Sequence, residues 1–293
     1  MAEQSVGGRP VRETTLGHAL APYYSSGRFL QDKHAATPAA AQNFPNWVLD
    51  QLDLSGLRAG LDAGCGWGRF SVQLLRRLPP GGCQLVCADL YQGMLTKARE
   101  TLTSEGFTAS YVVSDIAALP FDDRRFDMVM ANHVLYHAAD LPGAVRELAR
   151  VLTRAGSFVA TTNSDAVRVP LLEIHRAVLE GLGLGAPPEE PSSFNMENAT
   201  GVLSNVFTYV ETHVYHDVVH YDSAEALLKV YLNTGRYRMV MADTGISAET
   251  RDLVAPTFLA HAQKMLTEQG RIDSPQVMCA FVCGGAATGS PAG

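Results

Sequence analysis

The chain has 293 residues, of which 46% are hydrophobic, so it is long enough to bury a large packed core. Its formal net charge of −7 argues against a nucleic-acid-binding protein, which normally carries a basic patch that neutralises phosphates. No apolar run reaches the roughly 18 residues of a membrane span, and the polar N-terminus lacks the apolar segment of a secretory signal, so we expect a cytoplasmic protein.

The five cysteines are an odd number in a chain without a secretion signal, which favours free thiols over a disulfide framework. Two Cys-x3-Cys pairs occur, Cys83 with Cys87 and Cys279 with Cys283, but the Cys-x2-Cys spacing of structural zinc sites is absent. Both pairs lie in apolar, strand-like runs, where cysteine acts as a small hydrophobic residue. We therefore predict no metal site.

The first half of the chain predicts a parallel sheet. Residues 1–20 are expected to be disordered, and residues 21–56 have enough aromatic and apolar side chains to form a helical cap beside the first strand. From residue 57 to 163, short apolar runs alternate with amphipathic segments, which is typical of βαβ units. The expected strands are 57–63, 84–89, 110–113, 126–132 and 157–162, and the expected helices are 69–78, 92–104 and 141–152. Gly156 is expected at the turn that ends the last of these helices.

The second half is less regular. Residues 166–182 predict a helix, and the Gly- and Pro-rich stretch 181–194 predicts a mobile loop. Residues 205–221 alternate like a strand. Helices are expected at 223–232 and 248–268, a final strand at 276–285, and a flexible tail at 286–293.

The stretch LDAGCGWGRF, residues 61–70, places Gly64, Gly66 and Gly68 directly after the first expected strand. A dinucleotide-binding loop has the spacing Gly-x-Gly-x-x-Gly, whose third glycine lets the helix pack closely while its N-terminus faces a pyrophosphate. Here Arg69 stands in the place of that third glycine, which weakens the dinucleotide interpretation. No Gly-Lys-Ser/Thr follows, so the loop is not a P-loop.

Two acidic residues narrow the choice of ligand. Asp62 lies at the carboxyl end of the first strand, where it would repel a phosphate and attract a cation. Asp89 ends the next strand. Its separation in sequence from the glycine loop is about that at which an acidic side chain can accept from both hydroxyls of a ribose. Together they indicate a ligand with a ribose and a positive charge.

These motifs together resemble the class I S-adenosylmethionine (SAM) dependent methyltransferases. LDAGCGWGRF is similar to their first motif, CADL with Asp89 to the acidic end of their second strand, and SDIAALPF with Asp115 to the residue that meets the adenine amino group. FDMVMANHVLYHAADLPGAVRELARVLTRAGSFVATT resembles their fourth strand, the next helix and the fifth strand. The ordered series over residues 57–163 makes the resemblance specific.

The resemblance implies an α/β fold: a Rossmann-like, doubly wound, mostly parallel sheet of seven strands with helices on both faces and an antiparallel last strand. It implies one SAM-binding domain over residues 57–285, with the helical cap at 21–56 and an inserted helical and loop lid. The insertions at about 164–205 and 222–268 would then form the acceptor pocket, because such segments vary freely in this fold.

Two segments outside this core, 29–54 and 194–217, are similar to a bacterial branch that acts mostly on small molecules, many of them in specialised metabolism. That branch has Phe-x-x-Glu-Asn-Gly, whereas Ala199 and Thr200 precede Gly201 here, so the local turn is in question.

The implied activity is transfer of a methyl group from SAM to an O, N or C atom of a small-molecule acceptor, with S-adenosylhomocysteine as product. Near-attack geometry can supply much of the catalysis, and a general base is needed only for a protonated acceptor. His133 and His137 are the candidate catalytic residues; alternatively, His133 only lines the cofactor and His137 only packs. Val134 stands where a zinc-binding helix has glutamate, so no metal is expected.

The implied cofactor contacts lie in the glycine loop, at the ends of the second, third and fourth strands, or in the cap. They are Asp62, Gly64, Cys65, Gly66, Gly68, Asp89, Leu90, Met94, Asp115, Ile116, Asn132, His133, Tyr24 and His34. Tyr23, Arg28 and Trp47 either close over the cofactor or pack a helix. His213, His216 and His220 are expected at the surface or the sheet edge, without a role.

Three other functions stay open from sequence: SAM chemistry without methylation, such as a cyclisation or a pericyclic step; a non-catalytic SAM-binding module; and an RNA methyltransferase, which the charge disfavours. We expect a small-molecule acceptor as the partner, no nucleic acid, no membrane, and a monomer or homodimer.

Overall fold

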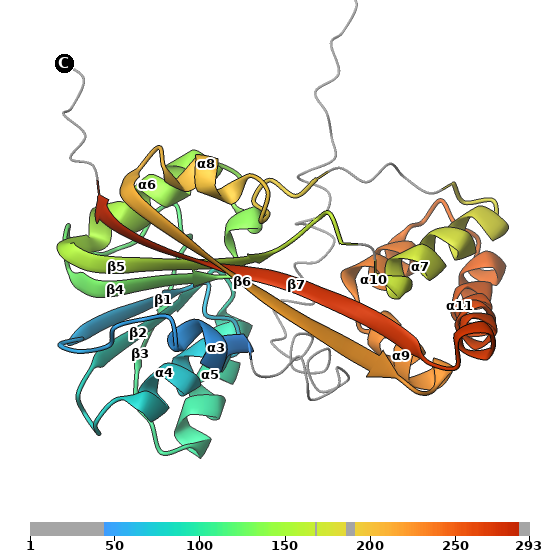
Figure 1. The fold of residues 1–293 in the computed structure, drawn as a ribbon, viewed down its shortest axis with the longest axis horizontal. Helices are drawn as coiled ribbons and strands as arrows, with labels where there is room; N and C mark the ends of the chain where they lie inside the picture. The colour runs from blue at the N-terminus through green and yellow to red at the C-terminus, as the bar shows by residue number, and fades with distance from the viewer. Residues whose placement is uncertain (1–43, 168, 186–190, 287–293) are drawn as a thin grey trace, which may run out of the picture.

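The computed structural model describes residues 44–167, 169–185 and 191–286. The strands are β1 (Ala59–Ala63), β2 (Gln84–Asp89), β3 (Ser110–Val113), β4 (Phe126–Asn132), β5 (Leu152–Asn163), β6 (Phe207–Tyr221) and β7 (Ile272–Ala286). They form a seven-stranded sheet in the order β3-β2-β1-β4-β5-β7-β6 (Figure 1). Strands β1 to β5 pair in parallel, and β7 is antiparallel to β5 and β6. The Rossmann-like sheet with an antiparallel last strand is confirmed.

Helices cover both faces of this sheet. Their bounds are α3 (Phe44–Leu49), α4 (Arg69–Arg77), α5 (Gln92–Ser104), α6 (Leu141–Val151), α7 (Pro170–Gly181), α8 (Ala199–Leu203), α9 (Ala224–Leu232), α10 (Gly235–Ala242) and α11 (Ala248–Gln269), with a 3-10 turn η2 (Leu135–His137). Met128 and Met130 of β4 pack with α3, α4 and α5, whereas Val129 and Ala131 pack with α6 and α8. Alternate side chains of a strand point to opposite faces, so one apolar strand serves two cores.

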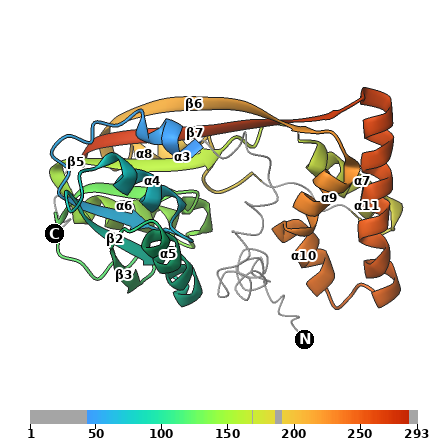
Figure 2. The same cartoon turned by 90° about the horizontal axis from the view of Figure 1, so that it is seen from below.

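Strands β6 and β7 reach past the rest of the sheet. They pair with each other from Phe207 and Ala286 to Tyr221 and Ile272, whereas β5 stops pairing with β7 at Asn163. The projecting two-stranded ribbon carries α7, α9, α10 and α11, which we call the helical lobe, at its far end (Figures 1 and 2). The lobe has its own apolar core. In the described ranges, no helix has the length and hydropathy of a membrane span.

Two expectations about the chain's local structure are wrong. Helix α6 ends at Val151, β5 begins at Leu152 rather than at residue 157, and Gly156 lies inside β5 rather than at the helix end. A Cβ on Gly156 would lie 2.8 Å from the Asp127 carbonyl oxygen, so close approach of the strands explains this glycine. Helix α10 was not predicted, because Val240 is its only buried residue and it has no apolar stripe.

The expected cap at residues 21–43, the expected disorder at 1–20 and the tail at 287–293 lie outside the described residues. The predicted lid and the domain boundaries stay predictions.

The helical lobe contains a buried histidine that should make its stability sensitive to acid. The Nδ1 atom of His175 lies 2.9 Å from the Tyr231 hydroxyl, and the Tyr231 ring stacks on Phe258 with centroids 3.9 Å apart. Burial, reinforced by the charge of Arg236, lowers the pKa of His175 to about 4. The unfolded chain therefore binds this proton at higher pH than the folded protein does.

We expect the free energy of unfolding to be unaffected by His175 above about pH 6.5, and to fall as the pH drops from there to about 4. The variant His175→Gln keeps a hydrogen-bond acceptor but does not titrate. Between about pH 6.5 and 4, the free energy of unfolding of His175→Gln should fall by about 2 kcal/mol less than that of the wild type, after allowance for partial solvent screening. Urea unfolding at several pH values measures this, with His216→Gln, an exposed histidine on β6, as the control. Equal acid sensitivity of wild type and His175→Gln would contradict the assignment.

Candidate functional site

The glycine loop joins β1 to α4 at the carboxyl edge of the sheet. Gly64, Gly66 and Gly68 all have positive φ angles, of 74°, 55° and 86°, which residues other than glycine rarely adopt. A Cβ on Gly64 would lie 2.3 Å from a methyl group of Val134. A Cβ on Gly68 would lie 3.3 Å from the Ala98 Cα. The loop is therefore held tightly against η2 and α5.

Asp89, at the end of β2, anchors this loop. Its two carboxylate oxygens accept hydrogen bonds from the backbone N–H groups of Gly66, at 2.9 Å, and Tyr91, at 3.0 Å. The side chain is buried, and burial raises its pKa although the two N–H groups act against the rise. An ionised carboxylate has about four acceptor positions, so each oxygen keeps room for a further hydrogen bond from a ligand.

Asp62, at the carboxyl end of β1, is 1% exposed and only half satisfied. Ser71 of α4 donates to its Oδ2 at 2.6 Å, whereas Oδ1 has no partner. Burial raises the pKa of Asp62 to about 6. A buried carboxylate with an unpaired oxygen is costly to the fold and is well suited to a cationic ligand.

The other expected cofactor residues near β2 and β3 differ in exposure. Asp115 is exposed and its Oδ1 accepts from the Ala117 N–H at 2.9 Å, while Ile116 beside it is buried. Leu90 is 54% exposed, and Met94 is enclosed at the start of α5. Asp115, Ile116 and Leu90 therefore lie at the same carboxyl edge as Asp89, and Met94 lies beneath it.

Backbone strain marks the end of β4. His133 has a φ of 52°, and its N–H donates to the Thr161 carbonyl at 3.0 Å. Its ring centroid lies 5.5 Å from that of Phe44. His137 is exposed in η2, so the two histidines do not share a helix. A non-glycine residue in the left-handed region often marks a functional site.

Buried polar atoms without a hydrogen-bond partner gather along this edge. They belong to the ends of β1, β3, β4 and β5 and are Asp62 Oδ1, Ser114 Oγ, Asn132 Oδ1 and Nδ2, and Thr161 Oγ1. Such atoms are expensive to bury unless a ligand or water satisfies them. Ser114 and Thr161 were not among the predicted site residues, although each is a polar residue at the end of an apolar run.

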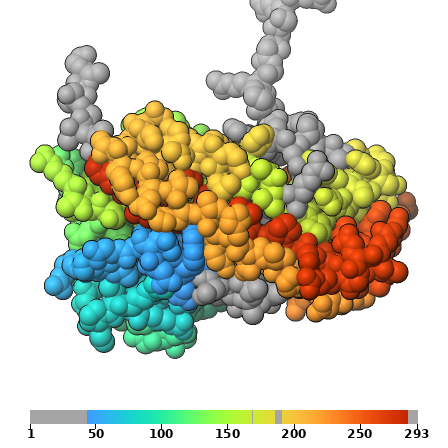
Figure 3. All heavy atoms as spheres, in the orientation of Figure 1, coloured from blue at the N-terminus to red at the C-terminus, as the bar shows by residue number. Residues whose placement is uncertain are grey.

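An aromatic cluster covers the neighbouring part of the sheet. Phe44 lies between His133 and Tyr215 of β6, with ring centroids 5.5 and 5.4 Å away, and Trp47 lies 5.1 Å from Tyr215. Figure 3 shows residues of α3 and β6 meeting at the surface. Burial lowers the pKa of the nearby Arg69 to about 10. Sequence spacing gave no sign that Phe44 and Tyr215 would meet.

The questioned turn before α8 is closed by side chains rather than by glycine. The side-chain oxygen of Asn198 accepts from the Asn195 N–H at 3.0 Å, and that of Asn195 accepts from the Asn198 N–H at 2.9 Å. Thr162 donates to the Phe194 carbonyl at 2.9 Å, which fixes this segment to the end of β5. Gly201 lies within α8, so its displaced position needs no special turn.

Of the remaining predicted cofactor residues, only Cys65 lies in the described part of the chain. Tyr23, Tyr24, Arg28 and His34 lie outside the described residues. Cys65 is buried beside the glycine loop, where its contact with Cys87 and its burial raise the pKa of its thiol. In the described part of the chain, no three His, Cys, Asp or Glu residues are grouped so that they could hold a metal ion.

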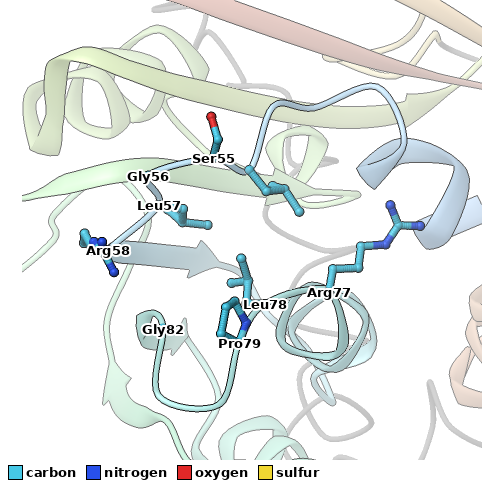
Figure 4. A pocket seen from close by; sticks show the side chains of 9 residues that line it. Ser55, Gly56, Leu57, Arg58, Arg77, Leu78, Pro79 and Gly82 are labelled. Carbon is cyan, nitrogen blue, oxygen red and sulfur yellow. The ribbon is translucent and has the colours of Figure 1, made fainter.

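A depression of about 430 Å³ lies at the opposite edge of the sheet (Figure 4). It is lined by residues 54–58, before β1, and by Arg77, Leu78, Pro79 and Gly82, after α4. These residues lie at the amino ends of β1 and β2, away from the acidic and unpaired groups. Ligands of open α/β sheets bind at the carboxyl ends, so we do not assign a function to this depression.

Comparisons with known proteins agree with this geometry. Residues 61–160 match the family model described as "Methyltransferase domain". The chain is 33% identical over 134 residues to the ubiquinone/menaquinone biosynthesis C-methyltransferase UbiE of Pasteurella multocida, covering 44% of this chain and 50% of that protein. It is 33% identical over 179 residues to the malonyl-[acyl-carrier protein] O-methyltransferase of Erwinia pyrifoliae, covering 60% and 64%. The chain thus spans between half and two thirds of these relatives' length.

The fold of the chain is also similar to that of solved proteins. The crystal structure of the YcgJ protein from Bacillus subtilis superimposes with a TM-score of 0.53 at 17% identity, covering 81% of this chain and 96% of that one. At that identity the match shows the fold alone. Residues 61–160 thus match a methyltransferase domain, and these matches support a class I SAM-dependent methyltransferase with SAM as its cofactor.

Proposed function

We propose that this protein transfers a methyl group from SAM to an O, N or C atom of a small-molecule acceptor by in-line displacement. The observation that carries the proposal is the buried, half-unpaired carboxylate of Asp62 beside the glycine loop, at the edge where His133 has a strained backbone. A buried carboxylate with an unpaired oxygen favours a cationic ligand, and a strained non-glycine residue at the same edge often marks a functional site.

The proposed cofactor contacts follow from the positions of the acidic residues. Asp62 faces the ammonium group of SAM, Asp89 accepts from the ribose hydroxyls, and Asp115 accepts from the adenine amino group. The loop residues Gly64 to Gly68 pack against the cofactor, with Leu90 and Ile116 beside the adenine. Asn132 and His133 border the methyl-bearing end. The support is that all these residues lie along the carboxyl edge of β1 to β4.

His133 is the stronger of the two candidate bases. It directly follows β4 in a strained conformation, whereas His137 is exposed on η2. A base at this position would take a proton from an acceptor that arrives protonated. If so, His133→Gln lowers kcat and removes the acidic limb of the pH profile of kcat, and it lowers kcat far more than it lowers the affinity for SAM. A retained acidic limb would assign His133 to packing.

The acceptor is proposed to be a small molecule of bacterial specialised metabolism, bound between the carboxyl edge and the helical lobe. The relatives do not decide the methylated atom, because one is named a C-methyltransferase and the other an O-methyltransferase. Support for a small acceptor comes from the net negative charge, which suits neither RNA nor DNA.

Product analysis tests the proposal. The protein is incubated with SAM and with extracts or compound panels, and the nucleoside products are separated by chromatography. Methyl transfer yields S-adenosylhomocysteine, whereas cyclisation of the aminobutyrate arm yields methylthioadenosine. We expect acceptor-dependent S-adenosylhomocysteine. SAM binding without any product would favour a binding module, and methylthioadenosine would contradict methyl transfer.

A further inference from the structure

A row of polar side chains crosses the part of the sheet beyond the cofactor contacts. In the strand register Asn132 of β4 pairs with Thr161 of β5, Thr161 pairs with Ala280 of β7, and Ala280 pairs with His213 of β6. Directly paired residues in neighbouring strands point to the same face. We call Asn132, Thr161 and His213 the polar row. It lies on the face covered by α3 and α4, because Ala280 belongs to the core on that side.

All three members carry buried atoms without a hydrogen-bond partner. Asn132 is 8% exposed and both of its amide atoms are unpaired, and Thr161 is 0% exposed with its hydroxyl unpaired. The Nε2 atom of His213 lies 3.3 Å from Glu211 Oε1, but the geometry of that contact is not that of a hydrogen bond. Many proteins tolerate one residue with a buried polar atom that lacks a hydrogen-bond partner. Three such residues in one register row indicate a polar ligand.

The row's chemistry selects a neutral partner. An amide and a hydroxyl each offer a donor and an acceptor, and neither is charged. Adjacent strands are about 4.8 Å apart, so the side chains of Asn132 and Thr161 are within reach of one bound oxygen. The aromatic rings of Phe44, Trp47 and Tyr215 lie on the same face and favour a planar, uncharged group. Arg69 is a charged neighbour of Tyr215, so an anionic probe must be compared directly with the neutral one.

We propose that the polar row is the acceptor's subsite and that it holds a neutral hydroxyl group of an aromatic or other planar acceptor. This inference rests on the proposed methyl transfer and specifies its substrate class. The hydroxyl oxygen bonds to the methyl carbon, the electrons of the broken carbon–sulfur bond go to sulfur, and the hydroxyl proton leaves to His133 or to water. Thr161 is a specificity residue that accepts from or donates to this hydroxyl.

The neighbouring Thr162 is a matched control. It is also a buried threonine of β5, 2% exposed, but its side chain points to the opposite face. Its hydroxyl donates to the Phe194 carbonyl at 2.9 Å. Replacing each threonine with the isosteric valine removes one hydroxyl, which is unpaired at position 161 and paired at position 162.

The first measurement is thermal unfolding of the ligand-free protein. Thr161→Val should leave Tm unchanged or raise it, because an unpaired buried hydroxyl costs stability. Thr162→Val should lower Tm by on the order of 2 °C, because it removes one of the two hydrogen bonds to the Phe194 carbonyl, the other being donated by Ser192 at 3.2 Å. A loss of Tm in Thr161→Val equal to that in Thr162→Val would show that Thr161 has a structural partner and would overturn the proposal.

The second measurement is ligand binding to the protein loaded with S-adenosylhomocysteine. The probes share one ring system and are 2-naphthol, which is neutral, 2-naphthylmethylamine, a cation, and 2-naphthoate, an anion. Affinity is measured by titration with NMR detection. We expect 2-naphthol to bind at least tenfold more tightly than either ion, and Thr161→Val, but not Thr162→Val, to weaken it about tenfold.

Three outcomes would overturn the subsite: no binding of 2-naphthol, equal binding of an ion, or no effect of Thr161→Val. Each leaves the proposed methyl transfer standing, because S-adenosylhomocysteine has bound. Failure of S-adenosylhomocysteine itself to bind would count against the proposed function, and with it against this inference.

Discussion

Replacing Asp62 with asparagine should stabilise the ligand-free protein and largely abolish its binding of SAM. The Asp62 carboxyl is fully buried and burial raises its pKa to about 6 from its usual 3.8. Keeping it ionised at neutral pH therefore costs the fold about 3 kcal/mol, which asparagine does not incur. Asparagine also removes the charge that faces the ligand's ammonium group, so SAM affinity should fall about 100-fold.

The pH dependence of Asp62 has a definite sign. In the unfolded chain the carboxyl ionises near its usual pKa, whereas in the folded protein it keeps its proton up to about pH 6. Stability from this group is thus complete below about pH 4 and is lost as the pH rises through 6. A bound cation reverses the preference, so wild-type SAM affinity should fall about tenfold for each pH unit below 6.

Chemical unfolding and calorimetry at pH 5 and 8 measure both effects. Asp127→Asn is the control: this carboxylate accepts from the Arg58 and Ala59 N–H groups, at 3.1 and 3.0 Å, at the other edge of the sheet. It should lower stability without changing SAM affinity. An Asp62→Asn variant that is less stable than wild type at pH 8, or that binds SAM normally, would refute the assigned role.

Asp89→Ala is expected to reduce SAM affinity by at least about 100-fold while the protein stays folded. The substitution removes the acceptor for the ribose hydroxyls and also releases the N–H groups of Gly66 and Tyr91 that now bind the carboxylate. The glycine loop therefore loses an anchor together with the ligand contact. Calorimetric titration with SAM gives the affinity, and circular dichroism reports the fold.

Asp115→Ala provides a graded comparison for this prediction. Asp115 is exposed and its Oδ1 accepts from the Ala117 N–H of its own turn, so its loss should weaken SAM binding by about tenfold. Asp89→Asn retains a side-chain acceptor, so its SAM affinity should lie between those of Asp89→Ala and Asp115→Ala. Undiminished SAM binding by folded Asp89→Ala would place the ribose elsewhere.

Much of the cofactor half was predictable because its signals are local. Strands β2, β3 and β4 have the predicted bounds, since each is a short apolar run between turn residues. The positive φ angles of the loop favour glycine at residues 64, 66 and 68, so the loop leaves a local signal in the sequence. The acidic residues follow directly from their places at the ends of strands, because parallel strands bring their carboxyl ends to one edge.

Errors arose where a residue's environment comes from distant parts of the chain. The sequence around Gly156 resembles a helix end. In the structure, glycine is needed there because a Cβ would lie too close to the Asp127 carbonyl oxygen of the neighbouring strand. His213 was expected at the surface or the sheet edge, and it lies half-buried on β6, the edge strand. Local periodicity does not encode that its Nε2 atom is enclosed without a hydrogen-bond partner.

The sequence by itself indicated the strands, the glycine loop and the acidic edge, because those depend on side-chain periodicity, backbone freedom and strand ends, and the resemblance to a known family implied the seven-stranded sheet. Only the tertiary structure decided that Asp62 is buried and half-unpaired, and that Asn132, Thr161 and His213 share one row. Register between strands far apart in sequence is set by packing of the whole sheet, so no local pattern reveals which polar groups will face one another without partners.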